Sequence, residues 1–442
     1  MIKIAPLFIA AMLVTLPKPT IAQQSASPLP IKDGFVFAVG GDLLGPYHPV
    51  TQLNDPGFAQ LVRILRSADA GFANQEGSIF DLATFPGYMA AENGGGTPLS
   101  SRAVARDLRA MGITMVSKAN NHATDWGVEG LLASDRSLDE AGVAHAGSGE
   151  SEAAARAPAY IDTAKGKLAL VATASTFTAM SAAGPPTVWK GQTTRPRPGI
   201  SVLHTQQIRL IPEEKFAALR EFSGGGRSAK SDSQEIKVGD QTFRSSDKSG
   251  LTYSMNKMDE EAILKSIRDG KQSANLLVFS IHAHETAGGS DDPQPADFLP
   301  TLFHDAIDYG ADIVVRHGPH VSSGIEIYKG KPIFYGFGSL FFDFQGRSSY
   351  TIPGTNTPIN FPPEWYETAV ALSTFRGGVV SEIRIYPLMI ESSDSPTGGL
   401  PRPAAPADAK RILERIQRDS AQFGTDMRIE NGIGIIRVPE TH

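Results

Sequence analysis

The chain has 442 residues, of which 41% are hydrophobic and 20% charged, an ordinary composition for a globular protein with a large buried core. It contains no cysteine, which excludes disulfides, thiolate catalysis and cysteine-bound zinc. Its formal net charge of −6 argues against nucleic acid as the main partner, because phosphate binding relies on a positive field.

The first 22 residues are typical of a secretory signal peptide. Lys3 precedes an apolar run from Ile4 to Leu16, and small residues come before a cleavage point near Ala22. The apolar run is shorter than the ~20 residues that a membrane-spanning helix needs, which favours cleavage over an uncleaved anchor. We therefore expect a soluble mature protein that is secreted or periplasmic.

After this segment, amphipathic helices alternate with short apolar strands, and each strand is followed by a polar loop. The predicted strands are Phe35–Val39, Ala70–Ala73, Ile113–Val116, Leu276–Ile281 and Ile313–Val315, and the predicted helices are Phe58–Arg66, Ser101–Met111 and Leu299–Tyr309. This alternation indicates an α/β fold, in which ligands gather beyond the carboxyl ends of the strands.

Five of these loops carry the residue types of an active site. They contain Asp42, Glu76, Asn120-Asn121-His122, His282-Ala283-His284 and His317-Gly318-Pro319-His320. A single one of these histidines is more often a hydrogen-bonded structural residue than a ligand. Their shared position at strand ends reverses that expectation and predicts one site assembled on a sheet.

Two segments interrupt the alternation. Residues 223–250 are rich in Gly, Ser, Lys and Asp, which is typical of either a mobile lid or a solvated surface loop. Residues 391–406 are rich in Ser, Gly and Pro and are predicted to link a main domain, residues 30–390, to a C-terminal segment, residues 407–442. That segment is predicted to hold a helix, Ala407–Gln422, and an edge strand, Ile433–Val438.

The loop around His122 suits acid–base chemistry. His122 can act as a general acid, Asp125 can orient its ring, and the neighbouring amides can offer oxygen ligands. The alternative is an Asx-rich turn that caps a helix starting near Val128.

The remaining histidines suit a metal. His282 and His284 alternate along an extended segment, so that one can bind a ligand while the other packs. His317 and His320 flank a Gly-Pro turn that can aim both rings at one point. Imidazole, carboxylate and amide oxygen together suit zinc, manganese or iron better than calcium or magnesium.

The chain resembles the CapA family of capsule and poly-γ-glutamate synthesis proteins from about Phe35 to Phe344. The matching strings are Val39-Gly40-Gly41-Asp42, Asn74-Gln75-Glu76-Gly77, Ala119 to Gly127 with Gly130-Leu131, Ser280 to Glu285, His317 to Val321, and Gly330 to Tyr335. The resemblance implies a calcineurin-like metallophosphoesterase fold, a four-layer α/β/β/α sandwich. It also implies a link to anionic poly-γ-glutamate at the cell surface, and contact with a membrane-bound polymer synthase.

The residues and the resemblance together give a candidate site with three kinds of members. The predicted metal ligands, for one or two divalent ions, are Asp42, Glu76, Asn121, His282, His317 and His320. The predicted catalytic residues are His122, Asp125 and Glu76, and the predicted substrate-binding residues are Arg316, Asn120 and His284.

The chain departs from the related phosphoesterases at four positions. Leu44 stands where a histidine ligand is usual, and Glu76 stands near the place of a bridging aspartate. Arg316 replaces a common glycine and Ser339 a common asparagine. A two-metal centre with ions roughly 3.5–4 Å apart is therefore in doubt, and Arg316 can instead bind a carboxylate or phosphate through its planar fork.

Three functions are compatible with these residues. The first is a hydrolase that acts on an anionic glutamyl polymer or a phosphoester, either with a metal or as a metal-free acid–base enzyme that uses Glu76 and a histidine. The second is a non-catalytic factor that binds or exports poly-γ-glutamate, which the missing ligand at Leu44 favours. The third, a structural role for the histidines, is the weakest, because polar strand ends are costly to bury.

Overall fold

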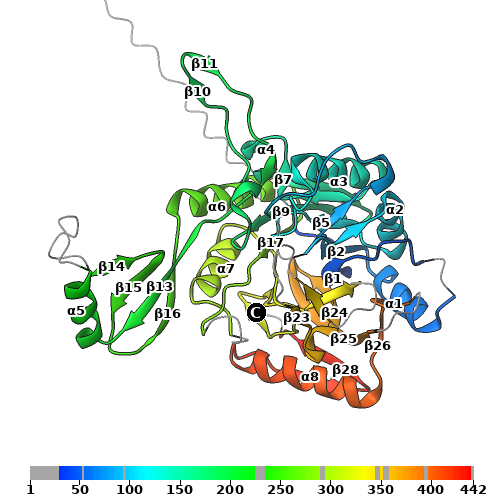
Figure 1. Ribbon diagram of the computed structural model, residues 1–442. Coiled ribbons are helices and arrows are strands. Elements are labelled where there is room, and N and C mark those ends of the chain that lie inside the picture. The colour runs from blue at the N-terminus through cyan, green and yellow to red at the C-terminus, as the bar shows by residue number, and fades with distance from the viewer. Residues whose placement is uncertain are drawn as a thin grey trace, which may run out of the picture.

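The computed structural model describes residues 29–51, 54–92, 96–223, 234–288, 294–343, 349–351, 358–392 and 397–439 (Figure 1). These residues form a mixed structure of helices and sheets, which confirms the predicted α/β class. The predicted signal peptide, residues 1–22, lies outside the described residues. In the part of the chain that the structure describes, no helix combines the length and the apolar character needed to cross a membrane.

The larger sheet has ten strands within the described residues, and β1 lies at its centre. Its order is β27-β28-β25-β24-β1-β2-β5-β6, with β21 paired to β1 and β26 paired to β25. Strands β1, β2, β5 and β6 run parallel, whereas β24 is antiparallel to β1. The bounds are β1 Phe35–Leu44, β2 Ala70–Asn74, β5 Met115–Ser117, β6 Ala144–Ala146, β21 Ser339–Phe342, β24 Glu367–Arg376, β25 Val379–Ile390, β26 Pro401–Pro403, β27 Met427–Glu430 and β28 Ile433–Arg437.

The smaller sheet has six strands in the order β19-β20-β18-β17-β9-β8. Its four inner strands, β9, β17, β18 and β20, run parallel, so their carboxyl ends lie at the same edge. The bounds are β8 Ala159–Thr163, β9 Gly166–Ala174, β17 Leu276–His282, β18 Ile313–His317, β19 Ile325–Tyr328 and β20 Lys331–Phe334.

The two sheets share an apolar core. Phe37 and Phe72 of the larger sheet belong to the same buried cluster as Val278 and Val315 of the smaller sheet. The strands that carry them are buried almost throughout, as expected for strands covered on both faces. This shared core holds the carboxyl ends of strands from both sheets next to each other.

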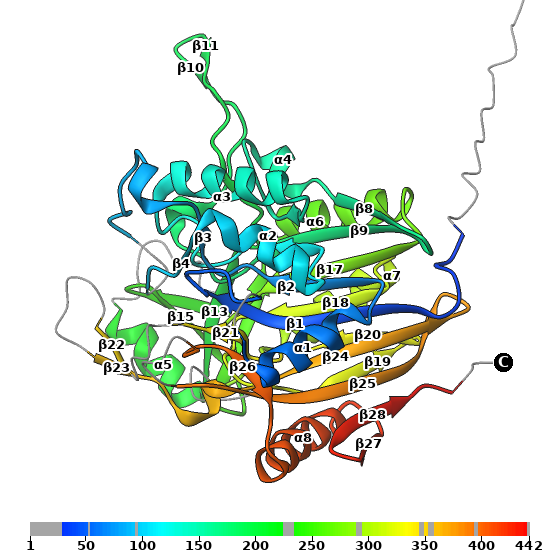
Figure 2. The same ribbon diagram turned by 90° about the vertical axis from the view of Figure 1, so that its right-hand side faces the viewer.

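Helices cover the outer face of each sheet (Figures 1 and 2). Side chains from α1, α2 and α3 form one buried cluster with the outer face of the larger sheet, and side chains from α6 and α7 form another with the smaller sheet. The helix bounds are α1 Pro56–Arg66, α2 Arg102–Met111, α3 Gly127–Ala141, α4 Glu152–Arg156, α5 Glu213–Phe222, α6 Lys257–Lys271, α7 Phe298–Asp308 and α8 Pro406–Ala421, with short 3-10 turns at Leu82–Thr84, Ala179–Ser181 and Pro363–Tyr366.

Local sequence explains where these helices begin and end. The Asp55 carboxylate accepts a hydrogen bond from the Phe58 amide at 2.7 Å, and Pro56 occupies the first turn, so α1 begins two residues before the predicted start. Gly112 ends α2 with a left-handed φ of 97°, a conformation that glycine adopts without a steric penalty.

The described part of residues 223–250 lies largely in strands, so the prediction of an irregular loop is wrong there. The strands β13 (Thr205–Ile211), β14 (Glu235–Val238), β15 (Gln241–Ser245) and β16 (Gly250–Met255) form a small separate sheet that carries α5. Figure 1 shows this unit standing out from the body of the molecule. Residues 224–233 lie outside the described part of the chain. β-Branched and aromatic residues at alternate positions outweigh the polar composition of this segment.

The segment predicted as a linker, residues 391–406, is also partly ordered in the sheet. Strand β26 pairs antiparallel with β25, and Leu400 is buried beside it. The chain then continues directly into α8, whose residues Ile412 and Ile416 pack into the core between the sheets. The C-terminal segment is therefore continuous with the main fold.

Four short strand pairs complete the structure within the described residues. They are β3 (Ser78–Ile79) with β4 (Leu99–Ser100), β7 (Ser148–Gly149) with β12 (Gly199–Ile200), β10 (Val188–Trp189) with β11 (Gln192–Thr193), and β22 (Ser349–Thr351) with β23 (Pro358–Asn360).

Candidate functional site

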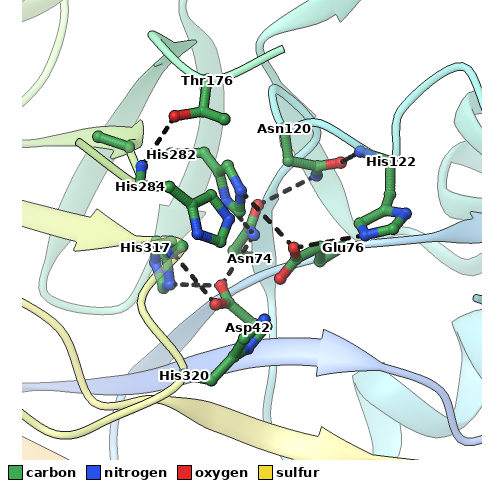
Figure 3. Close-up of polar contacts among 12 residues, drawn as sticks. Asp42, Asn74, Glu76, Asn120, His122, Thr176, His282, His284, His317 and His320 are labelled. Carbon is green, nitrogen blue, oxygen red and sulfur yellow. Dashed lines mark hydrogen bonds and ion pairs between the residues drawn. The ribbon is translucent and has the colours of Figure 1, made fainter. Parts of the chain in front are cut away.

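The polar strand ends meet in one place, between the carboxyl ends of the two sheets (Figure 3). Asp42 lies near the end of β1, and Asn74 is the last residue of β2 in the larger sheet. His282 ends β17 and His317 ends β18 in the smaller sheet. The sequence analysis predicted a site on one sheet. The site is instead divided between two sheets, because their shared core places both sets of strand ends at the same edge.

Asp42 is the most highly connected acid of the site. Its Oδ1 accepts a hydrogen bond from Asn74 Nδ2 at 2.8 Å and lies 3.0 Å from His317 Nδ1. Its Oδ2 accepts a hydrogen bond from the backbone amide of Gly318 at 3.2 Å. Burial alone would raise the pKa of Asp42, but the hydrogen bond and charge of His317 outweigh it and hold the pKa below its usual range. Asp42 is therefore an ionised carboxylate.

The backbone before Asp42 is packed too closely for a side chain. A Cβ on Gly41 would collide with the carbonyl group of Gly338, whose oxygen accepts a hydrogen bond from the Asp42 amide at 3.0 Å. Glycine at this position therefore lets β1 approach the segment that leads into β21, and this contact fixes the Asp42 backbone.

Glu76 lies between histidines from both sheets. Its Oε1 is 3.6 Å from His282 Nε2 and 3.9 Å from His122 Nε2. Ligand atoms of Glu76, His282 and His284 all lie within 4.8 Å of one another. Burial first, and then the nearby carboxylates of Asp42 and Asp125, raise the pKa of Glu76 well above its ordinary value.

Several buried polar atoms of the site point at one another without hydrogen bonds. Both carboxylate oxygens of Glu76 and the Nε2 atoms of His282, His284 and His317 have no hydrogen-bond partner among the described residues. Burial lowers the pKa of His282 well below its usual value and that of His284 to about 3, with like charges from neighbouring histidines adding to the effect. Neutral imidazoles and a carboxylate with unused lone pairs fit a divalent cation, which satisfies such atoms together.

His284 therefore takes a different place from the predicted one. It was assigned to substrate binding and expected to point away from His282, but residues two apart in an extended segment share a face. The His284 amide donates a hydrogen bond to Thr176 Oγ1 at 2.8 Å, and its ring lies 4.9 Å from that of His282, between ring centres. His284 thus belongs with the candidate metal ligands.

His122 is held by Asp125, which is three residues further along the chain. Their Nδ1 and Oδ2 atoms are 2.7 Å apart, so Nδ1 carries the proton and Nε2 faces Glu76. This arrangement leaves Nε2 available to give or take a proton in the site.

Asn120 connects neighbouring loops of the site, and its predicted role in substrate binding stays a prediction. It is fully buried, and its Nδ2 donates hydrogen bonds to the Gln75 carbonyl at 2.8 Å and to Asn74 Oδ1 at 3.3 Å. Its Oδ1 accepts a hydrogen bond from the His122 amide at 3.1 Å. Asn120 therefore joins the loops after β2 and β5. Asn121, a predicted metal ligand, is half-buried in the turn that follows.

His320 lies at the edge of the site against aromatic side chains. Its Nδ1 is 3.1 Å from Ser339 Oγ, and its ring centre is 4.3 Å from that of Trp365. Burial lowers the pKa of His320 to about 4, so the ring is neutral at pH 7. Leu44 packs with Phe342 in a small apolar cluster.

Arg316 holds the loop that carries His284, and its predicted role in substrate binding stays a prediction. Its side chain is 1% exposed. Its Nε donates a hydrogen bond to the Ala283 carbonyl at 3.0 Å, and one terminal nitrogen donates to the Glu285 carbonyl at 2.8 Å. The guanidinium fork therefore fixes the backbone on both sides of His284.

We predict that Arg316→Lys lowers the free energy of unfolding by about 2–3 kcal/mol, because lysine lacks the planar fork whose separate nitrogens reach the two carbonyls, and its charge remains buried. Chemical denaturation of the variant measures this, with the exposed Arg106→Lys as the matched control. Unchanged stability of the Arg316 variant would show that the fork does not support the loop.

Two residues of the site region were missed by the sequence analysis. Asn74 joins Asp42 to His282, since its Nδ2 lies 2.8 Å from the first and 3.2 Å from the second. Lys118 is fully buried, and its Nζ donates a hydrogen bond to the Gly77 carbonyl at 2.9 Å, directly after Glu76. Burial lowers the pKa of Lys118 to about 8. The position of Asn74 at a strand end was a usable signal, whereas nothing in the sequence marks Lys118 as buried.

Comparisons with known proteins match the part of the chain that contains the site. Residues 36–344 match the family described as bacterial capsule synthesis protein PGA_cap, a range that includes the site from Asp42 to Ser339. The uncharacterized protein y4sH of Sinorhizobium fredii is 37% identical over 440 residues, which is 92% of this chain and 94% of that relative. A probable polyglutamine synthesis accessory protein of Mycobacterium tuberculosis is 24% identical over 306 residues, 69% of this chain and 62% of its own length. The PGA biosynthesis protein CapA of Bacillus subtilis is 38% identical over 85 residues, 19% of this chain and 21% of its own length.

Proposed function

Because the chain belongs to the CapA family of bacterial capsule synthesis proteins, we propose that it is a metal-dependent hydrolase of poly-γ-glutamate or capsule metabolism. Its substrate is an anionic glutamyl polymer or a cell-surface phosphoester. It works outside the cytoplasm, after removal of residues 1–22, and alongside a membrane-bound polymer synthase. The names of its relatives, which refer to capsule, PGA and polyglutamine synthesis, support the pathway.

The observation that carries the proposal is the cluster of Glu76, His282 and His284. Their ligand atoms lie within 4.8 Å of one another, and their buried lone pairs have no hydrogen-bond partner among the described residues. Two packed sheets with helices outside them support the four-layer calcineurin-like metallophosphoesterase fold as the proposed architecture. In that fold a site at the strand ends between the sheets is the expected location.

Different residues of the site have different roles in the proposed reaction. A divalent metal held by Glu76, His282 and His284 would polarise the carbonyl or phosphoryl oxygen of the substrate. His122 takes a proton on Nε2 from the attacking water and delivers it to the leaving group, and Asp125 keeps its ring in the required orientation. Asp42 keeps His317 oriented through the 3.0 Å contact at Nδ1, and Nε2 of His317 has no hydrogen-bond partner among the described residues.

A hydrolysis screen tests the proposal. The purified protein is loaded with Zn²⁺, Mn²⁺ or Fe²⁺ and incubated with poly-γ-glutamate and, separately, with a chromogenic phosphodiester. Metal-dependent release of glutamyl fragments or of the chromophore is the expected result. Tight binding of poly-γ-glutamate with no product under any metal would overturn hydrolysis and favour the second function.

That second function is a non-catalytic factor that binds or exports the polymer. Leu44 favours it, because this position contributes an apolar side chain to the cluster around Phe342 and no metal ligand. A metal-free acid–base enzyme is a further alternative, which the raised pKa of Glu76 favours. The screen separates all three, since the acid–base enzyme would form product after chelation.

We predict that metal affinity falls as the pH is lowered. The raised pKa of Glu76 means that this carboxyl keeps its proton to higher pH than usual, and a metal must displace that proton. The lowered pKa values of His282 and His284 leave both rings neutral and free of such competition near pH 7. Titration calorimetry with Zn²⁺ at several pH values measures the slope. The Glu76→Gln variant should bind more weakly and with a flatter pH dependence, and an unchanged slope would contradict the assignment of Glu76.

A further inference from the structure

A short β-hairpin projects from the body of the molecule, far beyond the surface around it (Figures 1 and 2). It is formed by β10 and β11, which pair Val188 with Thr193 and Trp189 with Gln192. Lys190 and Gly191 form the tight turn at its tip, with φ values of 49° and 78°.

The tip combines exposed apolar side chains with positive charge. Val188 is 73% exposed and Trp189 is 70% exposed. Lys190, Arg195 and Arg197 are exposed in the same hairpin, and residues 163–212 contain no Asp or Glu. The rest of the chain is acidic, with a formal net charge of −6 overall. An exposed Trp next to cations is costly in water and suits the boundary between lipid headgroups and hydrocarbon.

The hairpin is fixed at its base. The Thr187 amide donates a hydrogen bond to Thr194 Oγ1 at 2.9 Å, and the Arg197 side chain donates one to the Met180 carbonyl at 3.1 Å. Ser181, at the start of the segment, is 2.6 Å from Thr124 between hydroxyl oxygens, which joins it to the loop of His122. The tip is therefore presented outwards by a structured base that contacts the candidate site.

We propose that this hairpin docks the protein on the anionic lipid headgroups of a membrane. Trp189 and Val188 enter the interfacial layer, and Lys190 and Arg195 lie at the lipid phosphates. A soluble anionic polymer would attract the cations but would offer no apolar layer for the exposed pair. A membrane accounts for both features. The docking is independent of catalysis, and it would hold the candidate site close to substrates made at the membrane.

Vesicle sedimentation with the purified protein tests the docking. The protein should bind vesicles that contain phosphatidylglycerol, bind pure phosphatidylcholine vesicles far less, and dissociate as salt is raised. Val188→Ser/Trp189→Ser should lower the partition coefficient about tenfold or more. The double variant Lys190→Gln/Arg195→Gln should lower it about 25-fold, about fivefold for each cation.

Matched controls lie elsewhere on the surface. Phe222→Ser removes a side chain that is 86% exposed at the end of α5, and Arg106→Gln/Lys215→Gln removes two exposed cations. Both controls should bind like the parent protein. The proposal is overturned if the parent protein does not bind anionic vesicles, or if the hairpin variants and the control variants bind these vesicles equally well. Hairpin-dependent binding of soluble poly-γ-glutamate without vesicle binding, or hairpin-dependent self-association without it, would also overturn the proposal.

Discussion

Substitution of His122 by asparagine is expected to lower the turnover of the hydrolysed substrate about 10²–10⁴-fold, the usual loss when a general acid or base is removed. Nδ1 of His122 is occupied by Asp125 at 2.7 Å, so Nε2, which faces Glu76 at 3.9 Å, is the atom that moves the proton. The metal ligands stay in place, and the metal content should not change. Steady-state kinetics and metal analysis of the same preparation measure both quantities.

The matched control for this substitution is His145→Asn. His145 is a half-buried histidine of β6 that pairs with Asp139 at 3.2 Å, outside the candidate site. Its replacement should leave turnover within about twofold of the parent value, as expected for a residue that touches no reacting group. Full turnover in the His122 variant would contradict its assignment as the proton donor, and loss of the metal would instead make it a ligand.

Substitution of Asp42 by alanine is expected to lower the free energy of unfolding of the metal-free protein by about 3–5 kcal/mol. The change leaves three buried groups without their acceptor: Asn74 Nδ2, His317 Nδ1 and the Gly318 amide. Their desolvation is then no longer compensated. Chemical denaturation in the presence of a chelator measures the effect on the fold alone, separate from any metal.

The exposed Asp162→Ala is the control for Asp42, because Asp162 makes only a 3.9 Å ion pair with Lys167 at the surface. Such a pair contributes about 0–1 kcal/mol. Equal stability of the Asp42 variant and this control would mean that the Asp42 network does not hold the two sheets together at the site.

The regular part of the fold could be predicted from sequence because each local signal agreed with the tertiary structure. The apolar stripe of α1 and the left-handed Gly112 at the end of α2 each act within a few residues of the helix that they define. The small sheet around β14 and β15 could not be predicted, since its composition resembles a loop and its strands are stabilised by pairing with β13 and β16. Strand β26 was missed for the same reason, because pairing with β25 overrides its two prolines.

The gathering of polar strand ends could also be predicted from sequence, because parallel strands place their carboxyl ends at one edge. The roles of single side chains could not be predicted from the sequence. Arg316 and Asn120 have functional groups suited to substrate, yet burial turns both towards backbone carbonyls. His284 was expected to point away from His282, but residues two apart in an extended segment share a face, and the two ring centres lie 4.9 Å apart. The burial of a side chain depends on distant segments of the chain.

The most direct test of a metal-binding site at the strand ends is the metal content of the purified protein, measured by mass spectrometry beside the double variant Glu76→Ala/His282→Ala. Far-ultraviolet circular dichroism of both proteins checks that the variant is folded. We predict about one zinc, manganese or iron ion per chain, lost in the variant, because these two residues supply two of the three clustered ligands. The site would be contradicted if the parent protein contained no metal and also failed to take up added Zn²⁺. It would also be contradicted if parent and variant had equal metal content.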